Sequence, residues 1–531
     1  MMMRLLFFTR RLVGVVVGVA LLVGGQEIRL SAVISGAKAT TQELIEGGAI
    51  FVGAAENVTL KADVCGGRIR SMKFSLFSVE ADGTRRLLEE RTEMASYAAG
   101  ELPPSRGFYD FERGASYEFR AEEQSVSAEV TFSVERAVVK KLTAGADADY
   151  GDRFGDTVAI SGNIVVIGAL DDNDVNNFDT GSVYVFRSDE NEWLSVAKLT
   201  ADDAAEDAHF GRSLAIDGDT IVVGSLLNSE AGEEAGSVYV FQTSDDGVTW
   251  TQVAKLTADD GEAYDFFGQA VAISSNIIVV GSYHDDDAGF NSGSVYVFQD
   301  LEQVAKLTAD DASGGTNQFQ GSNNGDNFGA AVAISGDTIV VGSPEDDNGQ
   351  GSAYVFQKND GSWTQVAKLI ADDASSYYRF GSSVAIDNDT IVVGSPDHNI
   401  GGSAYVFQDD GDWRQVARLV ADDAAEMDYF GVSVAVSDQK VVVGSWFDDD
   451  QGFNSGSAYV FSLRSDFPQV AKLTVADGAP TDRFGKSVAI ADNKVVVGAA
   501  DDDDVATTPY YYGFNYYITG SNSGAAYVFN V

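Results

Sequence analysis

The stretch FGSSVAIDNDTIVVGSPDHNIGGSAYVFQ, from Phe380 to Gln408, decides the fold of this 531-residue chain. It holds three short apolar runs that are separated by Asp, Asn and Gly residues, and it contains no recognisable catalytic group. Self-similarity at a fixed period is the signature of a repeat architecture. The same pattern returns every 50 to 61 residues and begins each time with Phe-Gly, at Phe154, Phe210, Phe267, Phe328, Phe380, Phe430 and Phe484.

Each repeat predicts four short strands. An apolar strand such as SVAI follows Phe-Gly, and a two-residue break of turn-forming residues separates it from a second strand of the TIVVGS kind. A variable acidic loop, a third strand reading GSVYVF or GSAYVF, and a fourth reading QVAKLTA complete the unit. The repeat therefore predicts a four-stranded antiparallel sheet. The breaks are 162–163, 218–219, 275–276, 336–337, 388–389, 438–439 and 492–493.

The strand inventory predicts that the sheets close into a ring. Sheets that are apolar on both faces must be covered on both faces, and radial stacking in a propeller does this for four to eight blades. The last repeat ends at Val531 after its third strand, whereas VVKKLTA, which ends at Ala144, has the fourth-strand pattern but precedes the first Phe-Gly. The sequence thus predicts an all-β, seven-bladed propeller over residues 137–531, closed by this upstream strand.

These residues resemble the FG-GAP repeat of integrin α-chain β-propellers. The resemblance covers residues 137–531 and rests on Phe-Gly, the apolar strand after it, and VVGSP or VVGAA. It implies a propeller fold and places ligand contacts on the face made by the second-to-third and fourth-to-first loops. Integrin-type repeats often carry a DxDxDG calcium loop between the first two strands, but here that connection is a two-residue turn. No integrin calcium ligand is therefore transferred.

The region before the propeller has a different pattern. Arg4, Arg10 and Arg11 precede an uncharged apolar run, and two glycines follow it, so residues 1–25 predict a secretory signal peptide. An uncleaved signal anchor, which would place the protein at the cell surface, is the alternative. Alternating apolar residues in SVSAEVTFSV and the hairpin pattern around residue 82 predict an Ig-like β-sandwich over 26–136. Export would make Asn57, in Asn-Val-Thr, an N-glycosylation acceptor.

Composition excludes several classes of function. With 81 acidic against 35 basic residues the net charge is −46, which is incompatible with binding a phosphate backbone, so nucleic acid is excluded as a partner. A single cysteine, Cys65, excludes an internal disulfide framework. No later apolar run is long enough to span a bilayer. A membrane association is therefore expected only through the N-terminal segment.

The predicted ligand face collects acidic residues, and two of its loops are nearly identical. DDDAGFNSG and DDDQGFNSG lie in different repeats and offer oxygen ligands of the kind that Ca²⁺ prefers. The alternative is an acidic solvated surface that serves solubility. The aspartates two residues before Phe-Gly are predicted to be turn or capping residues. The candidate calcium ligands are Asp285, Asp287, Asn291, Asp448, Asp450 and Asn454.

Catalytic patterns are weak. Gly-x-Ser recurs at Ser213, Ser383, Ser433 and Ser487, but other repeats have Thr or Ala there, which indicates a repeat position and no nucleophile. The three histidines lie in different repeats and are predicted to be surface residues. We therefore expect a secreted, non-catalytic binding or adhesion protein with an extracellular protein or glycan as ligand, assisted by Ca²⁺ or by no cofactor. The alternatives are a carbohydrate-active enzyme and a structural wall or matrix protein.

Overall fold

The structure is a computed structural model that divides into two units, residues 1–138 and 139–530. In the first unit it describes the backbone of seven strands. In the second it describes residues 139–173, 179–189, 192–315, 325–399, 401–437, 439–464, 466–503 and 523–531. Within these residues no helix has both the length and the apolar character that crossing a membrane requires.

The strands of the first unit form two separate sheets. β1 (Leu5–Phe8) pairs with β2 (Gly18–Leu21), and the other five strands form a sheet in the order β5-β4-β6-β3-β7. The remaining residues of the predicted sandwich lie outside the described part of the chain, so the Ig-like assignment stays a prediction. The bounds of the five strands are β3 (Asn57–Asp63), β4 (Ser71–Val79), β5 (Arg85–Met94), β6 (Ser116–Phe119) and β7 (Ser127–Ser133).

The first two strands of each repeat form a tight hairpin. The first strands, nearest the ring centre, are β9 (Phe154–Ser161), β13 (Phe210–Asp217), β17 (Ala270–Ser274), β21 (Ala331–Ser335), β25 (Ser383–Asp387), β29 (Val434–Ser437) and β33 (Phe484–Ala491). The second strands are β10 (Ile164–Ala169), β14 (Thr220–Ser225), β18 (Ile277–Ser282), β22 (Thr338–Ser343), β26 (Thr390–Ser395), β30 (Lys440–Ser445) and β34 (Lys494–Ala499).

The outer two strands of each repeat complete the sheet. The third strands are β11 (Ser182–Asp189), β15 (Ser237–Gln242), β19 (Ser294–Gln299), β23 (Ser352–Asn359), β27 (Ser403–Asp409), β31 (Ser457–Ser462) and β35 (Ala525–Asn530). The fourth strands are β12 (Glu192–Leu199), β16 (Thr251–Leu256), β20 (Glu302–Leu307), β24 (Ser362–Leu369), β28 (Trp413–Leu419), β32 (Gln469–Leu473) and β8 (Lys140–Leu142). Two single turns, η2 (Gly145–Asp147) and α1 (Asp346–Gly349), lie in connecting loops.

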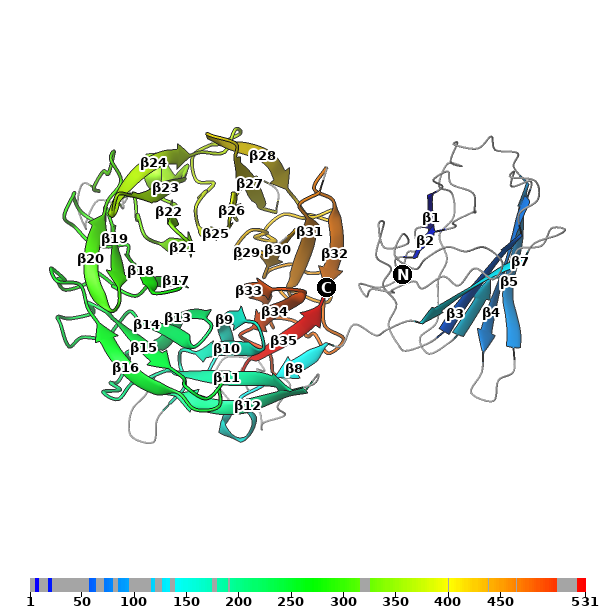
Figure 1. The fold of residues 1–531 in the computed structure, drawn as a ribbon, viewed down its shortest axis with the longest axis horizontal. Helices are drawn as coiled ribbons and strands as arrows, with labels where there is room; N and C mark the ends of the chain where they lie inside the picture. The colour runs from blue at the N-terminus through cyan, green and yellow to red at the C-terminus, as the bar shows by residue number, and fades with distance from the viewer. Residues whose placement is uncertain are drawn as a thin grey trace, which may run out of the picture. The chain divides into compact units, whose positions relative to one another are not determined.

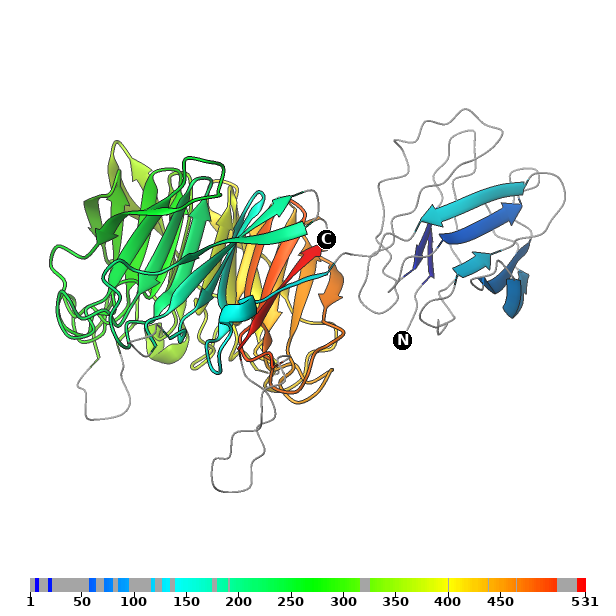
Figure 2. The same cartoon turned by 90° about the horizontal axis from the view of Figure 1, so that it is seen from below.

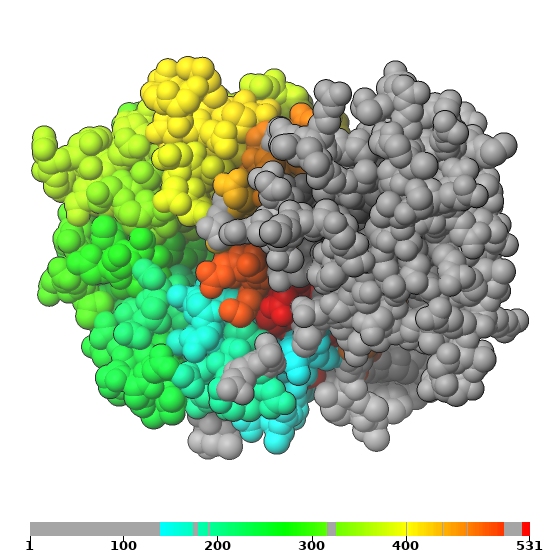
Figure 3. All heavy atoms as spheres, turned by 45° about the vertical axis from the view of Figure 1, so that its right-hand side comes forward, coloured from blue at the N-terminus to red at the C-terminus, as the bar shows by residue number. Residues whose placement is uncertain are grey.

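The seven sheets form a closed ring, and the predicted closing strand is confirmed. Six sheets are built from four consecutive strands, whereas the seventh has the order β33-β34-β35-β8. β8 pairs antiparallel with β35, with Lys141 opposite Tyr527. Figures 1 and 2 show the cyan β8 beside the red β35, and the space-filling view in Figure 3 shows cyan and red surfaces meeting. The two ends of the propeller unit therefore share one blade.

Phe-Gly recurs because both of its residues serve blade packing. Each glycine has a φ of 92° to 96°, in the left-handed region that glycine adopts without a steric penalty. A Cβ at Gly155 would lie 2.3 Å from the carbonyl oxygen of Ala525. The next-to-last residue of the second strand, a glycine, is equally constrained, since a Cβ at Gly281 would lie 2.0 Å from the carbonyl oxygen of Gly329 in the next blade. Neighbouring blades therefore approach through glycine backbones.

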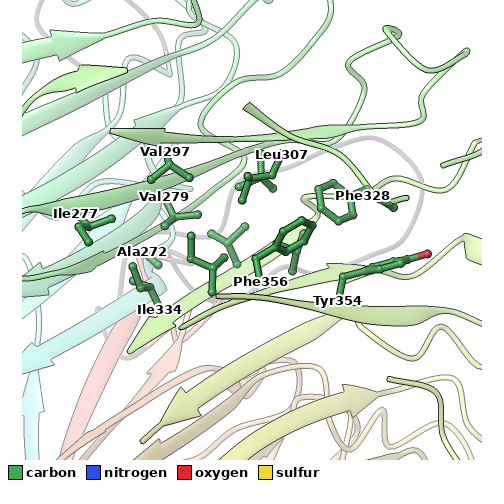
Figure 4. Close-up of a cluster of buried hydrophobic side chains, with 14 residues drawn as sticks. Ala272, Ile277, Val279, Val297, Leu307, Phe328, Ile334, Tyr354 and Phe356 are labelled. Carbon is green, nitrogen blue, oxygen red and sulfur yellow. The ribbon is translucent and has the colours of Figure 1, made fainter. Parts of the chain in front are cut away.

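The core lies between neighbouring blades. In the cluster between the third and fourth blades (Figure 4), Val279, Val297 and Leu307 meet Phe328 and Phe356, and all five are buried. The Phe328 ring packs edge-on against the Phe356 ring with their centroids 5.9 Å apart. Burying one side chain of this size contributes about 1.5–3 kcal/mol, so the many such contacts around the ring are the main stabilising term.

The outermost strands differ from the inner ones in burial. All positions of β10 are buried, whereas β20 alternates between exposed and partly buried positions, because only one of its faces meets the neighbouring blade. The first residue of six of the predicted two-residue turns has a φ of 50° to 56°, as tight hairpin turns require. The seventh turn begins at residue 438, which lies outside the described residues.

Candidate functional site

The second-to-third and fourth-to-first loops lie on one face of the propeller, which we call the acidic face. Consecutive antiparallel strands alternate in direction, so these two kinds of loop emerge at the same ends of the strands. Figure 2 shows η2 and α1, which belong to one loop of each kind, toward the same side of the ring. The candidate calcium ligands are all in loops of this face.

Carboxylates on the acidic face converge on a lysine of the fourth strand. In the third blade, Lys306 Nζ lies 2.8 Å from Asp260 and 2.9 Å from Asp285, and it also pairs with Asp287. The Tyr296 hydroxyl donates to Asp260 Oδ1 at 2.9 Å and to Asp285 Oδ2 at 2.7 Å. Lys306 Nζ lies 5.1 Å from the centroid of the Tyr296 ring. The ammonium group of Lys306 thus links the fourth-to-first loop, which carries Asp260, to the second-to-third loop, which carries Asp285 and Asp287.

The same cluster recurs around the ring with small changes. The second blade has Asn228 in place of the loop aspartate, and the fifth has Arg418 in place of the lysine. Burial opposes the charged form of these lysines, but hydrogen bonds to the aspartates overcome it and raise the pKa of Lys306 and Lys472. Lys306 and Lys472 are therefore charged at every physiological pH. Six lysines lie 5.1–5.3 Å from the tyrosine ring of their blade, namely Lys141, Lys198, Lys255, Lys306, Lys368 and Lys472.

The structure brings the predicted calcium ligands together only in part. Asp448 and Asp450 converge with Asp423, and their carboxylate oxygens lie within 4.8 Å of one another, but Lys472 Nζ is 2.6–2.8 Å from all three. Asn454 has a φ of 53°, and its backbone N–H donates to Asp449 Oδ1. Asn291 and Asp286 repeat this contact in the third blade. The two asparagines are thus turn residues, and a lysine holds the central position between the aspartates.

One histidine prediction is wrong. His398 was expected at the surface, but its side chain is fully buried, because it occupies the place that a loop aspartate has in five other blades. Its Nε2 lies 3.2 Å from Asp373, and its Nδ1 lies 3.0 Å from the Arg418 guanidinium. Burial and the Arg418 charge lower the pKa of His398. His209 and His284 are partly buried.

The aspartates two residues before Phe-Gly accept backbone hydrogen bonds, as predicted. Asp482 Oδ2 accepts the N–H of Ala479 at 2.6 Å, and Asp152 accepts that of Asp149 at 2.6 Å. Desolvation raises the pKa of both carboxyl groups to about 7. Each has its second oxygen buried without a hydrogen-bond partner among the described residues. The corresponding Asp265, Asp326 and Asp428 have pKa values raised to about 6 by the same cause.

The Gly-x-Ser positions are also structural. Ser213 Oγ donates to the carbonyl of Gly268 in the next blade at 2.8 Å, and Ser487 Oγ donates to that of Gly155 at 2.9 Å. Thr157 makes the same contact with Gly211 at 2.7 Å. These hydroxyls are therefore donors that link adjacent first strands, and none is placed as a nucleophile.

Large apolar side chains are exposed at one repeat position of the acidic face. Three residues before Phe-Gly, Tyr264, Tyr377 and Met427 are 46%, 76% and 74% exposed, and their φ values are 69° to 71°. In the last blade Thr481 holds this position, and its N–H donates to the backbone carbonyl of Phe453, a neighbouring loop residue that is 67% exposed. We call Tyr264, Tyr377, Met427 and Phe453 the outer contact ring. Two features of the sequence alone could have revealed it, namely the constant offset from Phe-Gly and the apolar character.

Sequence reasoning also missed the central role of lysine. The signal was available, because the tyrosine of the third strand and the lysine of the fourth occur at fixed places in SVYVF and QVAKL. Pairing in β19 and β20 puts Tyr296 directly opposite Lys306. Aspartates were conspicuous by their number, whereas the lysine that recurs at one place of the fourth strand in six of the seven blades was not.

Seven four-stranded blades, closed by a strand from the start of the unit, define a seven-bladed β-propeller with a loop-built acidic face. The chain belongs to the FG-GAP repeat family. The family model matches seven segments, each of which begins at or near the fourth strand of the preceding blade, so the match includes the closing strand. The segments are 137–186, 193–241, 250–298, 301–356, 363–407, 413–461 and 467–529.

Two of the solved structures that match the chain show only remote sequence similarity. No curated protein matches the chain. Sqt1 of Saccharomyces cerevisiae is 11% identical with a TM-score of 0.38, and the alignment covers 74% of this chain and 98% of Sqt1. The β-propeller domain of the Trilobed protease from Pyrococcus furiosus is 11% identical with a TM-score of 0.39, over 66% of this chain and 91% of that domain. At such scores neither similarity adds to the functional assignment.

Proposed function

We propose that the chain is a secreted or cell-surface binding protein without catalytic activity, whose acidic face contacts an extracellular protein or glycan. The outer contact ring carries the proposal. The backbone three residues before Phe-Gly, where Tyr264, Tyr377 and Met427 lie, is left-handed in every blade, and the first and fourth blades meet this requirement with Gly151 and Gly325. A bulky residue in this conformation costs about 1 kcal/mol or more. Tyr377 and Met427 bear that cost while their side chains remain largely exposed, which favours a role in contacting a partner.

Two observations support the non-catalytic part of the proposal. The residues closest to a nucleophile pattern, such as Ser213, are occupied in contacts between blades. Among the described residues, the carboxyl groups whose pKa is raised to about 6 or 7 are buried, with 1–6% of each residue exposed, and they are those of Asp152, Asp265, Asp326, Asp428 and Asp482. A general acid must reach its substrate within hydrogen-bond distance. Export rests on the arginines and apolar run of residues 1–25.

Calcium assistance remains a prediction at the loops of the third and sixth blades. Asp287 and Asp450 have exposed side chains and would be the first ligands that a cation from solution meets. A Ca²⁺ ion there would share its carboxylates with Lys306 or Lys472. The binding experiment below is therefore run both in millimolar Ca²⁺ and in EDTA.

Arrays of extracellular matrix proteins and of glycans, probed with the purified full chain, test the proposal. We expect binding that falls at least tenfold in the Tyr264→Gly/Tyr377→Gly/Met427→Gly variant, because glycine is the residue that other blades carry at this position. The control variant Asp219→Asn/Asp337→Asn/Asp389→Asn alters hairpin turns of the opposite face and should bind as the wild type does. Wild-type binding by the glycine variant, equal to that of the control variant, would contradict the proposal. Turnover of a polysaccharide that one Asp substitution abolishes would favour the enzyme alternative.

A further inference from the structure

A second set of strained residues directly precedes the Phe-Gly pairs, two residues nearer in sequence to the first strand than Tyr264, Tyr377 and Met427. The residue directly before each Phe-Gly has a φ of 50° to 56° in all seven blades. Asn327 is the residue type that tolerates this conformation best, yet the other blades carry large side chains there. We call these residues, with the two residues after each second strand, the axial ring. The strained members are Arg153, His209, Phe266, Asn327, Arg379, Tyr429 and Arg483.

Three arginines of the axial ring are fixed by carboxylates and remain partly exposed. Arg379 Nε lies 2.9 Å from Glu345, and Arg483 Nη1 lies 2.9 Å from Asp501. Arg153 is paired in the same way, and the exposed fractions of the three side chains are 45%, 52% and 35% in chain order. A guanidinium has five N–H donors in a planar fork, so one carboxylate leaves donors open to a ligand. Each pair presents donors and acceptors side by side.

Aromatic side chains of the axial ring cluster in the third and sixth blades. The Trp446 and Phe447 rings stack with centroids 4.6 Å apart, and Tyr429 packs edge-on against Phe447 at 5.2 Å. The Arg483 guanidinium lies 5.4 Å from the Trp446 ring centroid, and Lys486 Nζ lies 5.8 Å from it. In the third blade the Phe266 and Tyr283 rings stack at 5.7 Å. All of these aromatic residues are partly exposed.

The axial ring, together with the first-strand residues beside it, is close to electrically balanced, although the chain as a whole carries −46. Asp156 of the first blade pairs with Lys486 of the seventh, and its other oxygen lies 3.9 Å from Arg212 of the second, so these contacts cross between first strands at the ring centre (Figure 1). Every basic side chain named for the axial ring thus lies within 3.9 Å of a carboxylate. The acidic loops around it would repel a polyanion.

We propose that the axial ring binds a neutral glycan, with a sugar ring packed on Trp446 and sugar hydroxyls bonded to the Arg483–Asp501 pair. A hydroxyl both donates and accepts hydrogen bonds, which matches a fixed arginine–carboxylate pair. The C–H face of a sugar packs against the negative face of an aromatic ring. The strained backbone supplies independent support, since such strain persists where the side chain serves a function. This inference rests on the proposed function and names its ligand class.

Titration calorimetry and glycan arrays with neutral oligosaccharides, namely chitotriose, cellotriose, mannotriose and xylotriose, test the inference on the full chain. Uronic and sulfated oligosaccharides are the comparison. We expect one neutral class to bind, with affinity unchanged between low and high NaCl. Trp446→Leu and Arg483→Asn should each weaken binding, Trp446→Leu at least tenfold, while the melting temperature is kept or raised. Leu226 and Asn327 are the residues that other blades carry at these positions, so both variants should fold.

Arg414→Asn is the matched control, because Arg414 is an exposed arginine of a fourth strand, and its binding should equal that of the wild type. Preference for sulfated or uronic ligands, or full affinity in Trp446→Leu, would overturn the inference. Loss of a protein ligand in the outer-ring glycine variant, without any glycan binding, would overturn the inference while leaving the proposed function intact. If the outer-ring glycine variant still bound both protein and glycan ligands as the wild type does, the proposed function would be contradicted.

Discussion

Asp152 and Asp482 each lie two residues before a Phe-Gly pair and are buried beside a loop aspartate. Burial disfavours their charged form and raises the pKa of each carboxyl group to about 7. The native chain therefore keeps these protons at pH values where the unfolded chain has lost them, and between about pH 4 and pH 7 its stability falls as pH rises. Asp260 and Asp423 act in the opposite sense. Burial alone would raise their pKa, but Lys306 and Lys472 hold it below the usual value, so their stabilisation is lost only in strong acid.

We expect the propeller to be most stable near pH 5 and less stable at pH 8. Asp482→Asn keeps an oxygen for the Ala479 N–H and removes the buried charge, so it should add about 1–3 kcal/mol at pH 8 and little at pH 5, since one pKa unit corresponds to about 1.4 kcal/mol. Urea unfolding at both pH values and constant ionic strength measures this, with exposed Asp219→Asn as the control. A free energy of unfolding that rises from pH 5 to pH 8 would refute the assignment.

At the scale of elements, the closing strand is the most informative one. β8 supplies the fourth strand of the last blade, and its Leu142 is buried in the cluster that joins the first and last blades. No local feature of residues 140–142 marks them as part of a sheet with residues 525–530. The assignment follows from the offset between strand types, which is a property of the whole repeat array.

Deletion of residues 137–144 should lower the melting temperature of the propeller by several degrees or more, because it exposes the edge of β35 and the packing around Leu142. Differential scanning calorimetry would measure the change. Deletion of residues 26–125 is the control and should leave the propeller transition where it is, since residues 139–530 form a separate unit. An unchanged transition in the shorter deletion would disprove closure by β8.

Some features of the propeller could be predicted from the sequence, and others could not. Periodicity predicts the number of blades, the strand order, the hairpin turns and the ring closure, because the same pattern recurs seven times in the sequence. The lysine-centred clusters depend on which side chains meet across loops, and acidic residues were too abundant to show which ones meet. His398 was misplaced although the sequence holds a signal, since it lies three residues after Ser395 just as Asp285 lies three residues after Ser282. The left-handed backbone of Tyr377 and Arg379 has no signal in a single repeat.

At the scale of the whole molecule, the propeller has a repeated scaffold and unrepeated contact positions. Phe-Gly, the glycine near the end of the second strand and the tyrosine–lysine clusters recur with few changes and hold the blades together. The positions one and three residues before Phe-Gly vary from glycine or asparagine to arginine, tyrosine and methionine at a constant backbone conformation. A scaffold that keeps its backbone and varies its exposed side chains is what binding surfaces on rigid frameworks have in common. The central claim is that these side chains are kept for contact with a partner, at a cost in stability.

The melting temperature of the Tyr264→Gly/Tyr377→Gly/Met427→Gly variant tests this claim most directly, and it requires no knowledge of the ligand. The account predicts that the variant melts at the same temperature as the wild type or higher, because glycine relieves three left-handed positions whose side chains are largely exposed. A melting temperature several degrees below that of the wild type would contradict the account, because it would mean that these side chains stabilise the fold.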